Sequence, residues 1–406
     1  MSPATPLARV LLYSHDTYGL GHLRRNLVLA RRLLALPSAP QVVLATGSPV
    51  IDRIPLPAGL ACVPLPPVVK TGTDQYRPLE PSLDISLVRR ARSAVLSDVV
   101  RRWKPDALLV DHAPHGMKGE LVPVFETIRR SAPGARVILG LRDILDEPER
   151  VVASWRADGV VETLERVYDA VLVYGERSVF DLARLYRLPP SVAGRLEYCG
   201  YVAGPPPAAP VAPPGLAPGS DYLLGTVGGG GDGVEVLVAA ARAATSAGLR
   251  AVLCTGPLMP AADRARLLHA VGARPDVIVA EHLPDLAGVA AGARCVVSRG
   301  GYNTLSEVVG LGVPVVVVPR AAPRREQVLR AEAFARRGLV RMVGEGDDLG
   351  ESLLDAVSGT IAGQRRPRER LALDGSIRAV DSVRRLVEQR PAPPHAATAD
   401  RLGVPA

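Results

Sequence analysis

The chain has 406 residues, 47% of them hydrophobic and 4% aromatic, and a formal net charge of +8. This length exceeds one ordinary core and predicts two domains packed mainly by Ala, Val and Leu. The positive charge does not indicate nucleic-acid binding, because lysine occurs only at Lys70, Lys104 and Lys118 and the arginines are not interleaved with aromatic residues.

Membrane and cysteine patterns narrow the setting further. No apolar run reaches the ~18 residues of a membrane span, and the start of the chain lacks a signal-peptide pattern. We therefore expect a cytoplasmic protein, with peripheral membrane contact left open. The four cysteines are too scattered for disulfides or a metal site and are expected to be small buried residues.

Strand-like runs alternate with helical stretches along the whole chain, which predicts parallel α/β sheets. The strands expected in the first half are Arg9–Tyr13, Gln41–Ala45, Ala107–Asp111, Arg136–Leu141, Ala170–Tyr174 and a short one near Leu196–Tyr201. Those expected in the second half are Tyr222–Val227, Arg250–Cys254, Asp276–Val279, Arg294–Ser298 and Pro314–Pro319.

These elements group into two similar domains. Residues 1–204 form the first, 205–220 a proline-rich and semi-rigid linker, and 221–365 the second. Closing helices are expected at 366–390, and 391–406 reads as a disordered tail. The pattern predicts two Rossmann-like domains with parallel sheets that face each other across a ligand-binding cleft.

A glycine loop follows the first strand of each domain. In "YSHDTYGLGHLRRN", Gly19 and Gly21 precede a helix and present backbone N–H groups to the cleft. This is not a dinucleotide-binding fingerprint, because Arg24 replaces its third glycine and no acidic residue ends the second strand.

The second domain carries two more glycine-rich turns. Four glycines, Gly228 to Gly231, follow its first strand, and "SRGGYNTLSE" places Gly300 and Gly301 between a strand and a helix. A helix N-terminus with bare backbone N–H groups is suited to a phosphate. The alternatives are a flexible loop and a tight strand-to-helix turn. Neither loop is a P-loop, because no Gly-Lys-Ser/Thr follows.

From the glycine run through "EHLPDLAGVAAGARCVVSRGGYNTLSEVVGLGVPVVVVP", the second half resembles the nucleotide-sugar-binding domain of glycosyltransferase family 28. This family includes the N-acetylglucosaminyltransferase that completes the peptidoglycan lipid precursor. The segment "GLGHLRRN" resembles the family's glycine loop ending in histidine, although the first 204 residues match more loosely. The resemblance implies a GT-B fold, an inverting mechanism and no metal or other cofactor. The sequence has no Asp-x-Asp pair in a context suited to a diphosphate-bound metal.

The resemblance also implies roles for residues of the donor site. Glu307 would bind the ribose, the first helical turn would hold the diphosphate, two helix residues would bind the sugar hydroxyls, and a loop would hold the base through its backbone. Besides Glu307 and the glycines, the matching residues are Tyr302, Asn303, Thr304, Glu326, Gln327, His282 and Leu283. A capping box from Thr304 to Glu307, and plain helix-surface roles for Glu326 and Gln327, are the alternatives.

Transfer to an acceptor needs a base, and His22 matches the family's loop histidine. Its pKa lies near neutrality, which suits proton transfer or charge support. Asp111 and His15 are the further candidates, although spacing alone does not show which pair assembles. A loop histidine that only bonds backbone remains the alternative.

The expected function is transfer of a sugar from a UDP-sugar, with UDP-N-acetylglucosamine as one candidate donor. The acceptor is unknown and is small-molecule, lipid-linked or carrier-bound. Nucleotide-sugar hydrolysis or epimerisation by the same fold, and nucleotide-sugar binding without catalysis, are the alternatives.

Overall fold

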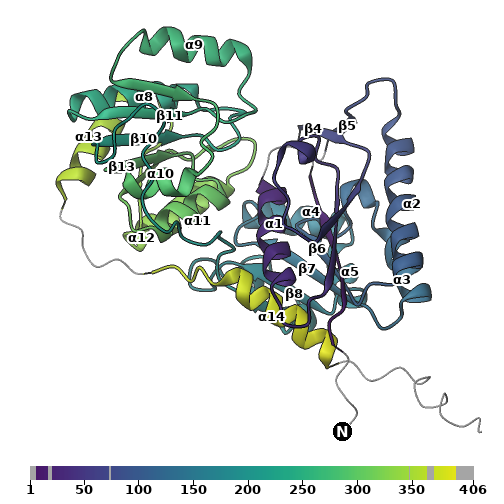
Figure 1. Ribbon diagram of the computed structural model, residues 1–406. Coiled ribbons are helices and arrows are strands. Elements are labelled where there is room, and N and C mark those ends of the chain that lie inside the picture. The colour runs from purple at the N-terminus through teal and green to yellow at the C-terminus, as the bar shows by residue number, and fades with distance from the viewer. Residues whose placement is uncertain (1–5, 17–20, 73–74, 347, 364–369, 390–406) are drawn as a thin grey trace, which may run out of the picture.

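The computed structural model describes residues 6–16, 21–72, 75–346, 348–363 and 370–389. Gly19, the tail at 391–406 and the start of the predicted closing helices lie outside the described residues. Two lobes, each built on a parallel sheet, make up the molecule (Figure 1). No helix of the described chain has the length and apolar character needed to cross a bilayer.

The first sheet has the strand order β3-β2-β1-β6-β7-β8-β9, and all its pairs are parallel. Its central strands are buried on both faces, as runs such as "VLLYS" and "ALLVD" require. The strand order reverses between β1 and β6. The strands are β1 Arg9–Ser14, β2 Gln41–Thr46, β3 Leu60–Pro64, β6 Ala107–Asp111, β7 Arg136–Arg142, β8 Ala170–Tyr174 and β9 Leu196–Tyr198.

Helices cover both faces of this sheet, and an antiparallel hairpin of β4 and β5 lies beside α2. Asp84 caps α2 by accepting hydrogen bonds from the N–H groups of Ser86 and Leu87. The hairpin strands are β4 Val68–Gly72 and β5 Gln75–Pro78. The helices are α1 Gly21–Leu34, α2 Ile85–Trp103, α3 Val122–Ser131, α4 Pro148–Ala157, α5 Val160–Arg166, α6 Leu182–Leu185 and α7 Pro190–Ala193, with short 3₁₀ turns η1 Ile51–Arg53 and η2 Met117–Gly119.

The second sheet has the order β12-β11-β10-β13-β14-β15, again parallel throughout, and reverses between β10 and β13. The strands are β10 Tyr222–Thr226, β11 Arg250–Cys254, β12 Val277–Ala280, β13 Cys295–Ser298, β14 Val315–Val317 and β15 Arg341–Met342. The helices are α8 Val234–Ser246, α9 Ala261–Val271, α10 Leu286–Gly292, α11 Tyr302–Gly310, α12 Glu326–Arg336 and α13 Leu349–Ala362. Alanine-rich α8 packs between the sheet, α9 and α13, which explains why it is apolar on most sides.

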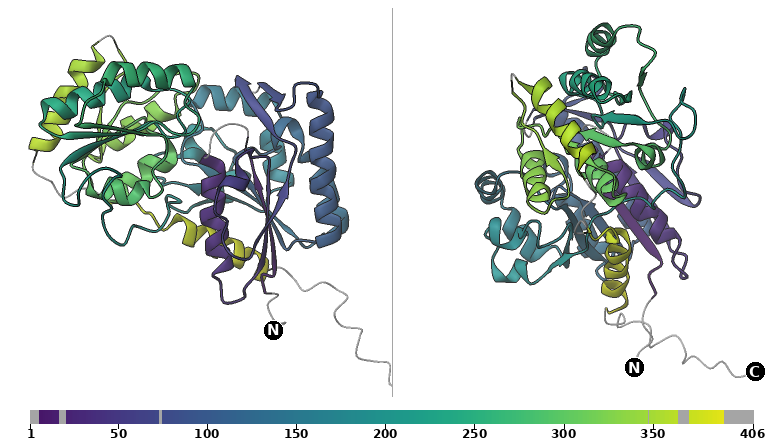
Figure 2. Two further views of the ribbon diagram at one scale, coloured as in Figure 1. Left: turned by 45° about the horizontal axis from the view of Figure 1, so that its top comes forward. Right: turned by 90° about the vertical axis from the view of Figure 1, so that its left-hand side faces the viewer.

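The last helix, α14 (Gly375–Glu388), returns to the first domain and packs on α1 and β7 (Figures 1 and 2). Val380 and Val383 are buried in the first domain's core. The Nε atom of Arg136 on β7 donates a hydrogen bond of 2.9 Å to the carbonyl of Leu386. The first domain is therefore built from two separate parts of the chain.

A buried ion pair joins the two domains. Asp143, which follows β7, and Arg330 on α12 lie 2.7 Å apart, and each side chain is 1% exposed. Arg330 also donates to the carbonyl of Gly300, so the same side chain contacts a predicted donor-site loop. A more exposed pair, Glu147 with Arg325, lies on the same interface.

Candidate functional site

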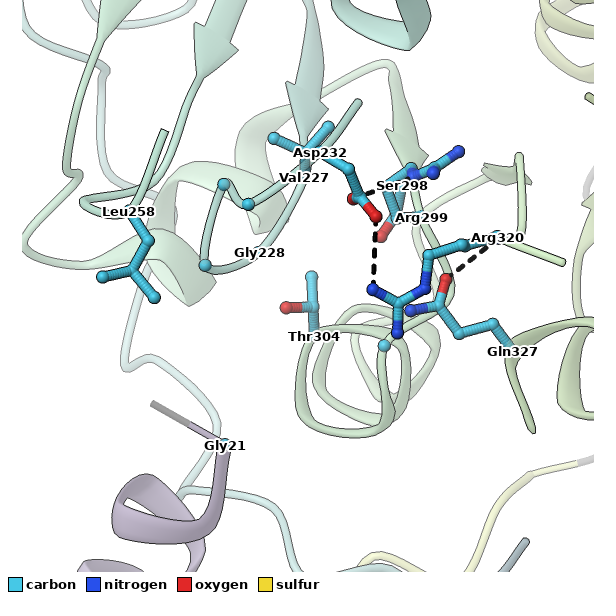
Figure 3. Close-up of a pocket in the computed structure, with 14 residues that line it drawn as sticks. Gly21, Val227, Gly228, Asp232, Leu258, Ser298, Arg299, Thr304, Arg320 and Gln327 are labelled. Carbon is cyan, nitrogen blue, oxygen red and sulfur yellow. Dashed lines mark hydrogen bonds and ion pairs between the residues drawn. The ribbon is translucent and has the colours of Figure 1, made fainter. Parts of the chain in front are cut away.

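A cavity of about 230 Å³ opens at the carboxyl edge of the second sheet. It lies where the strand order reverses between β10 and β13, the place where open α/β sheets bind ligands. Loops, two helices of the second domain and one residue of the first domain surround it (Figure 3). The lining residues are Gly21, Val227, Gly228, Gly229, Gly230, Gly231, Asp232, Leu258, Ser298, Arg299, Gly301, Thr304, Arg320 and Gln327.

The glycine run after β10 forms one wall of the cavity. Gly230 has a φ of +89°, and a Cβ there would lie 2.1 Å from the carbonyl oxygen of Thr255. Any larger residue would collide with the backbone that follows β11. Close backbone packing therefore fixes this loop, which favours a shaped ligand wall over a merely flexible segment.

The first turn of α11 forms the facing wall. The helix begins at Tyr302, and its N-cap, Gly301, makes no side-chain capping bond. A Cβ on Gly301 would meet no atom within 4 Å, so this helix end is uncovered. Unpaired N–H groups and the helix dipole attract an anion here. Thr304 is the third residue of the helix, so the alternative of a capping box starting at Thr304 is wrong.

Two guanidinium groups that were not predicted add positive charge to the cavity. Arg320 lies 3.2 Å from Asp232, and the Nε atom of Arg299 lies 3.5 Å from the same carboxylate. Arg299 also pairs with Glu345. Figure 3 shows Asp232 between the two arginines. Two glycine-rich walls, a helix N-terminus and two arginines together suit a diphosphate.

The two residues predicted to bind the sugar differ in their positions. Gln327 lines the cavity, and its Oε1 atom accepts a hydrogen bond of 3.1 Å from the backbone N–H of Arg320. Glu326 is 6% exposed and does not line the cavity, and its Oε2 atom is buried without a hydrogen-bond partner. The interpretation of Glu326 as a surface residue is therefore wrong.

Glu307 faces the first domain. It pairs with Arg24 on α1 at 3.2 Å, and its side chain is 16% exposed. Burial raises the pKa of Glu307, and Arg24 opposes this shift. Glu307 does not line the cavity as described, so its ribose role stays a prediction.

Other predicted donor residues are spread around the site. Tyr302 is buried, and its hydroxyl accepts a hydrogen bond from the N–H of Val202, so its side chain serves packing between segments rather than the cavity. Asn303 donates to the carbonyl of Gly21 at 2.9 Å and bridges the domains. His282 is exposed and Leu283 is buried, and neither lines the cavity.

The first domain presents a histidine–aspartate pair at its own switch point, between β1 and β6. The Nδ1 atom of His22, the second residue of α1, lies 2.5 Å from the Oδ2 atom of Asp111 at the end of β6. Arg25, one helical turn later, donates to the other carboxylate oxygen of Asp111 at 2.6 and 3.0 Å. Arg25 is buried, although two adjacent arginines near the start of a helix would be expected from the sequence to be solvated.

These contacts determine the charge of the pair. Burial alone would raise the pKa of Asp111, but Arg25 and His22 outweigh it and hold the pKa below its ordinary value. Burial, and then the Arg25 and Arg142 cations, lower the pKa of His22, although Asp111 opposes them. An ionised Asp111 can only accept, so it fixes the proton of neutral His22 on Nδ1 and leaves Nε2 free to take a proton.

Two further histidines stand beside His22. The ring centroids of His15 and His112 lie 5.8 and 5.1 Å from that of His22. The Nδ1 atom of His15 lies 3.5 Å from the Tyr13 hydroxyl. The structure therefore brings all three predicted catalytic candidates together, and His22 is the one that pairs with Asp111.

Two sequence signals could have found the residues that were missed. Arg25 lies three residues after His22, so a helix puts both side chains on one face. Arg299 and Arg320 each come directly after or close to the carboxyl end of a buried strand, at the edge where ligands bind. Asp232 directly follows the glycine run and carries no comparable signal.

Comparison with known proteins agrees with this arrangement. Residues 227–374 match the glycosyltransferase family 28 C-terminal domain. A relative from Corynebacterium glutamicum (strain R), a UDP-N-acetylglucosamine–N-acetylmuramyl-(pentapeptide) pyrophosphoryl-undecaprenol N-acetylglucosamine transferase, is 32% identical over 98 residues. That match spans 22% of this chain and 28% of the relative's length.

Solved structures extend the likeness to both domains. MurG of Acinetobacter baumannii aligns with a TM-score of 0.55 and 16% identity, over 93% of this chain and 99% of that one. A putative UDP-N-acetylglucosamine 2-epimerase of Listeria monocytogenes aligns with a TM-score of 0.63 and 13% identity, over 95% and 98%. At these identities the likeness concerns the fold, and it confirms the predicted architecture. The chain thus has the GT-B fold, and residues 227–374 of its second domain are similar to the glycosyltransferase family 28 C-terminal domain.

Proposed function

We propose that the protein is an inverting glycosyltransferase that moves a sugar from a UDP-sugar to an acceptor hydroxyl group. One observation carries the proposal: the His22–Asp111 pair stands at the start of α1, and its neighbour Gly21 lines the diphosphate-suited cavity of the other domain. A base on one domain and a nucleotide-sugar site on the other meet across one cleft. The family-28 domain supports the donor side.

In the proposed reaction, Nε2 of His22 takes the proton from the acceptor hydroxyl as its oxygen forms a bond to the anomeric carbon. The bond from that carbon to the diphosphate breaks, and its electron pair leaves with UDP. Attack from the face opposite to UDP inverts the anomeric centre. Asp111 stabilises the imidazolium that forms.

The second domain stabilises the departing charge. The N–H groups at the start of α11, the glycine loop and the guanidinium groups of Arg299 and Arg320 surround the place for the diphosphate. Such fixed donors act where charge develops. These protein groups can stabilise the leaving diphosphate without a metal. That the reaction needs no metal stays a prediction.

The proposal does not specify the donor sugar or the acceptor. The name of the Corynebacterium relative gives UDP-N-acetylglucosamine as donor and an undecaprenol-linked acceptor, so this donor is the first to test. Small-molecule, lipid-linked and carrier-bound acceptors all fit a hydroxyl nucleophile.

Donor binding and chemistry can be tested separately. UDP should stabilise the protein against heat more than NAD, FAD or ATP do at the same concentration. At 100 times its dissociation constant, UDP should add about 2.7 kcal/mol to the free energy of unfolding. His22→Ala should leave UDP affinity unchanged and lower turnover by ~10²-fold or more. EDTA should leave the UDP affinity and the turnover of the wild-type protein unchanged. Equal stabilisation by NAD, or full turnover by the variant, would contradict the proposal.

Epimerisation or hydrolysis of the nucleotide sugar is the second candidate, favoured by the fold likeness to the Listeria epimerase. Incubation with a UDP-sugar alone separates the candidates, because a transferase turns over little without acceptor. An epimerised UDP-sugar, or rapid release of free sugar, would replace the proposed function. Tight donor binding with no turnover under any acceptor would indicate a binding protein.

A further inference from the structure

Arg142 is the last residue of β7 and lies at the carboxyl edge of the first sheet. Asp111 pairs in register with Gly140 on this strand, and Arg142 is two residues further along. Alternate residues of a strand share a face, so Arg142 and Asp111 project from the same face. Arg142 also pairs in register with Tyr174, whose ring centroid lies 5.8 Å from the Cζ atom of Arg25. Arg142 therefore belongs to the group of side chains around the candidate base.

The Arg142 cation has no direct partner in the described part of the chain. Its Nε atom is buried without a hydrogen-bond partner, and no carboxylate of the described residues lies in ion-pair contact with it. Burial and the cations of Arg25, Arg330 and Arg324 lower its pKa to about 10, while Glu326 opposes this shift. The residue as a whole is half-buried, so its guanidinium is partly desolvated without an ion-pair partner, and such groups concentrate where a ligand supplies the partner.

Two residues that act electrostatically on Arg142, or on which Arg142 acts, also have buried polar atoms without hydrogen-bond partners. Nδ1 of His112 is buried without a partner, and the residue has a φ of +69°, which costs a non-glycine residue energy. On the opposite domain, Oε2 of Glu326 is also buried without a hydrogen-bond partner, while Oε1 of the same carboxylate lies 3.7 Å from Arg320. Electrostatic effects link both residues to Arg142. Both domains therefore contribute buried polar atoms without hydrogen-bond partners, on His112 in the first domain and on Glu326 in the second.

An anion that pairs with Arg142 would not be part of the donor. The donor cavity is lined by the second domain, with Gly21 as the contribution of the first, and Arg299 and Arg320 already provide its cations. Arg142 lies outside that lining and beside His22 and His112. An anion held by Arg142 would thus lie on the side from which the acceptor hydroxyl approaches His22.

We propose that Arg142 binds an anionic group of the acceptor, a carboxylate or a phosphate, close to the hydroxyl that His22 deprotonates. The inference rests on the proposed function and narrows the acceptor to molecules with such a group. A guanidinium suits both anions, because its N–H groups match two oxygens at once. Nδ1 or Nε2 of His112 can donate to the same anion.

The test uses the full chain saturated with UDP, so that the donor cavity is filled. Inorganic phosphate and acetate are titrated in separate arms at constant ionic strength, and binding is followed by calorimetry. At least one anion should bind saturably, and Arg142→Met should weaken it ~10-fold or more, the loss of about 1.4 kcal/mol. Arg102→Met, whose side chain is 82% exposed on α2, is the matched control and should not change binding.

The arms identify the anion: binding of phosphate alone indicates a phosphorylated acceptor, and binding of acetate alone a carboxylate. No binding of either anion, or equal binding by Arg142→Met, overturns the inference and leaves the proposed function standing. Failure of UDP itself to bind overturns the proposed function and this inference with it.

Melting of the ligand-free protein gives an independent readout. Arg142→Met should melt no lower than the wild type, because it removes a half-buried cation that has no ion-pair partner and keeps most of the side-chain volume. A clear fall in melting temperature would mean that Arg142 is held by a protein carboxylate such as Glu326, and would overturn the inference.

Discussion

Asp111 is held by two side chains of one helix, and each contact has a separate consequence. The hydrogen bond to His22 fixes the tautomer, while the two bonds from Arg25 fix the carboxylate and keep it ionised. The same Arg25 cation lowers the pKa of His22. One arginine therefore keeps the base both oriented and unprotonated near neutral pH.

This arrangement predicts the acid side of the pH–rate profile. A base works when unprotonated, and the lowered pKa of His22 keeps it so below pH ~6.5, its ordinary pKa. Activity should therefore persist below that pH. Arg25→Gln removes a cation, raises the pKa of His22 and should move the loss of activity to higher pH. The pH dependence of kcat/KM for both proteins is the measurement.

Unchanged UDP affinity of Arg25→Gln would show that the donor domain is intact. An acid side that does not move would show that Arg25 has no effect on the base.

Asp232 occupies both cavity arginines when no diphosphate is present. Its side chain is 39% exposed, so the pairs are weak and a diphosphate must compete with them. Asp232→Asn should strengthen UDP binding by up to about 5-fold, the worth of an exposed ion pair of ~1 kcal/mol. Calorimetric titration with UDP measures this. Asp263→Asn on α9, which also removes an arginine partner, is the control. Weaker binding by Asp232→Asn would mean that Asp232 contacts the ligand favourably.

At the scale of elements, a buried ion pair joins α2 to the segment before α3. Arg92 and Glu120 are both fully buried, and Glu120 also accepts a hydrogen bond of 2.6 Å from the Tyr13 hydroxyl. Arg92 donates further to the carbonyl of Pro66, just before the β4–β5 hairpin. This pair therefore ties α2, β1 and the hairpin together, although no sequence pattern pointed to it.

Replacing one partner of the Arg92–Glu120 pair should destabilise the protein more than replacing both. Glu120→Gln leaves a buried arginine uncompensated and should lower the free energy of unfolding by ~3–5 kcal/mol. The double variant Arg92→Met, Glu120→Leu should show a smaller decrease in the free energy of unfolding. Both tryptophans, Trp103 and Trp155, lie in the first domain, so their fluorescence in urea reports that domain alone. A double variant that loses as much as the single one would contradict this account.

The strands that were predicted and those that were not differ in kind. Buried runs such as "VVVVP" and "ALLVD" have a composition that only a sheet interior explains, and the predicted positions agree with the structure. The strands β3, β4, β5 and β15 were missed, because they are short, edge-located or interrupted by proline. Positions in the glycine loops could be predicted from the glycines. Arg142, Arg299 and Arg320 stand at or just after strand ends, so their place at the carboxyl edge could be predicted, but their spatial grouping could not, because it depends on which strands become neighbours.

At the scale of the molecule, the Asp143–Arg330 pair holds the base and the donor cavity in one arrangement. Asp143 also accepts a hydrogen bond from Tyr201, in the segment that leads out of the first domain. Because Arg330 contacts Gly300, movement of the domains is coupled to the loop before α11. The pair is more deeply buried than the Glu147–Arg325 pair on the same interface.

Loss of this pair should loosen the domains. Asp143→Asn leaves Arg330 uncompensated, so small-angle X-ray scattering should show a larger radius of gyration, and turnover should fall while UDP affinity is retained. Glu147→Gln removes the more exposed interdomain pair and should leave the scattering unchanged. Identical scattering curves for Asp143→Asn and the wild type would show that other contacts hold the domains.

The return of α14 to the first domain has a consequence for how the protein is made. The ribosome synthesises the strands of the first domain early, but the helix that covers α1 and β7 emerges only after the whole second domain. The second domain is continuous in the chain and can fold as soon as it is complete. The first domain must wait, with the surface that Val380 and Val383 cover still exposed to chaperones. A polypeptide released before α14 is made would therefore have a folded second domain and an incompletely folded first domain. Cellular quality control could distinguish it from the whole protein.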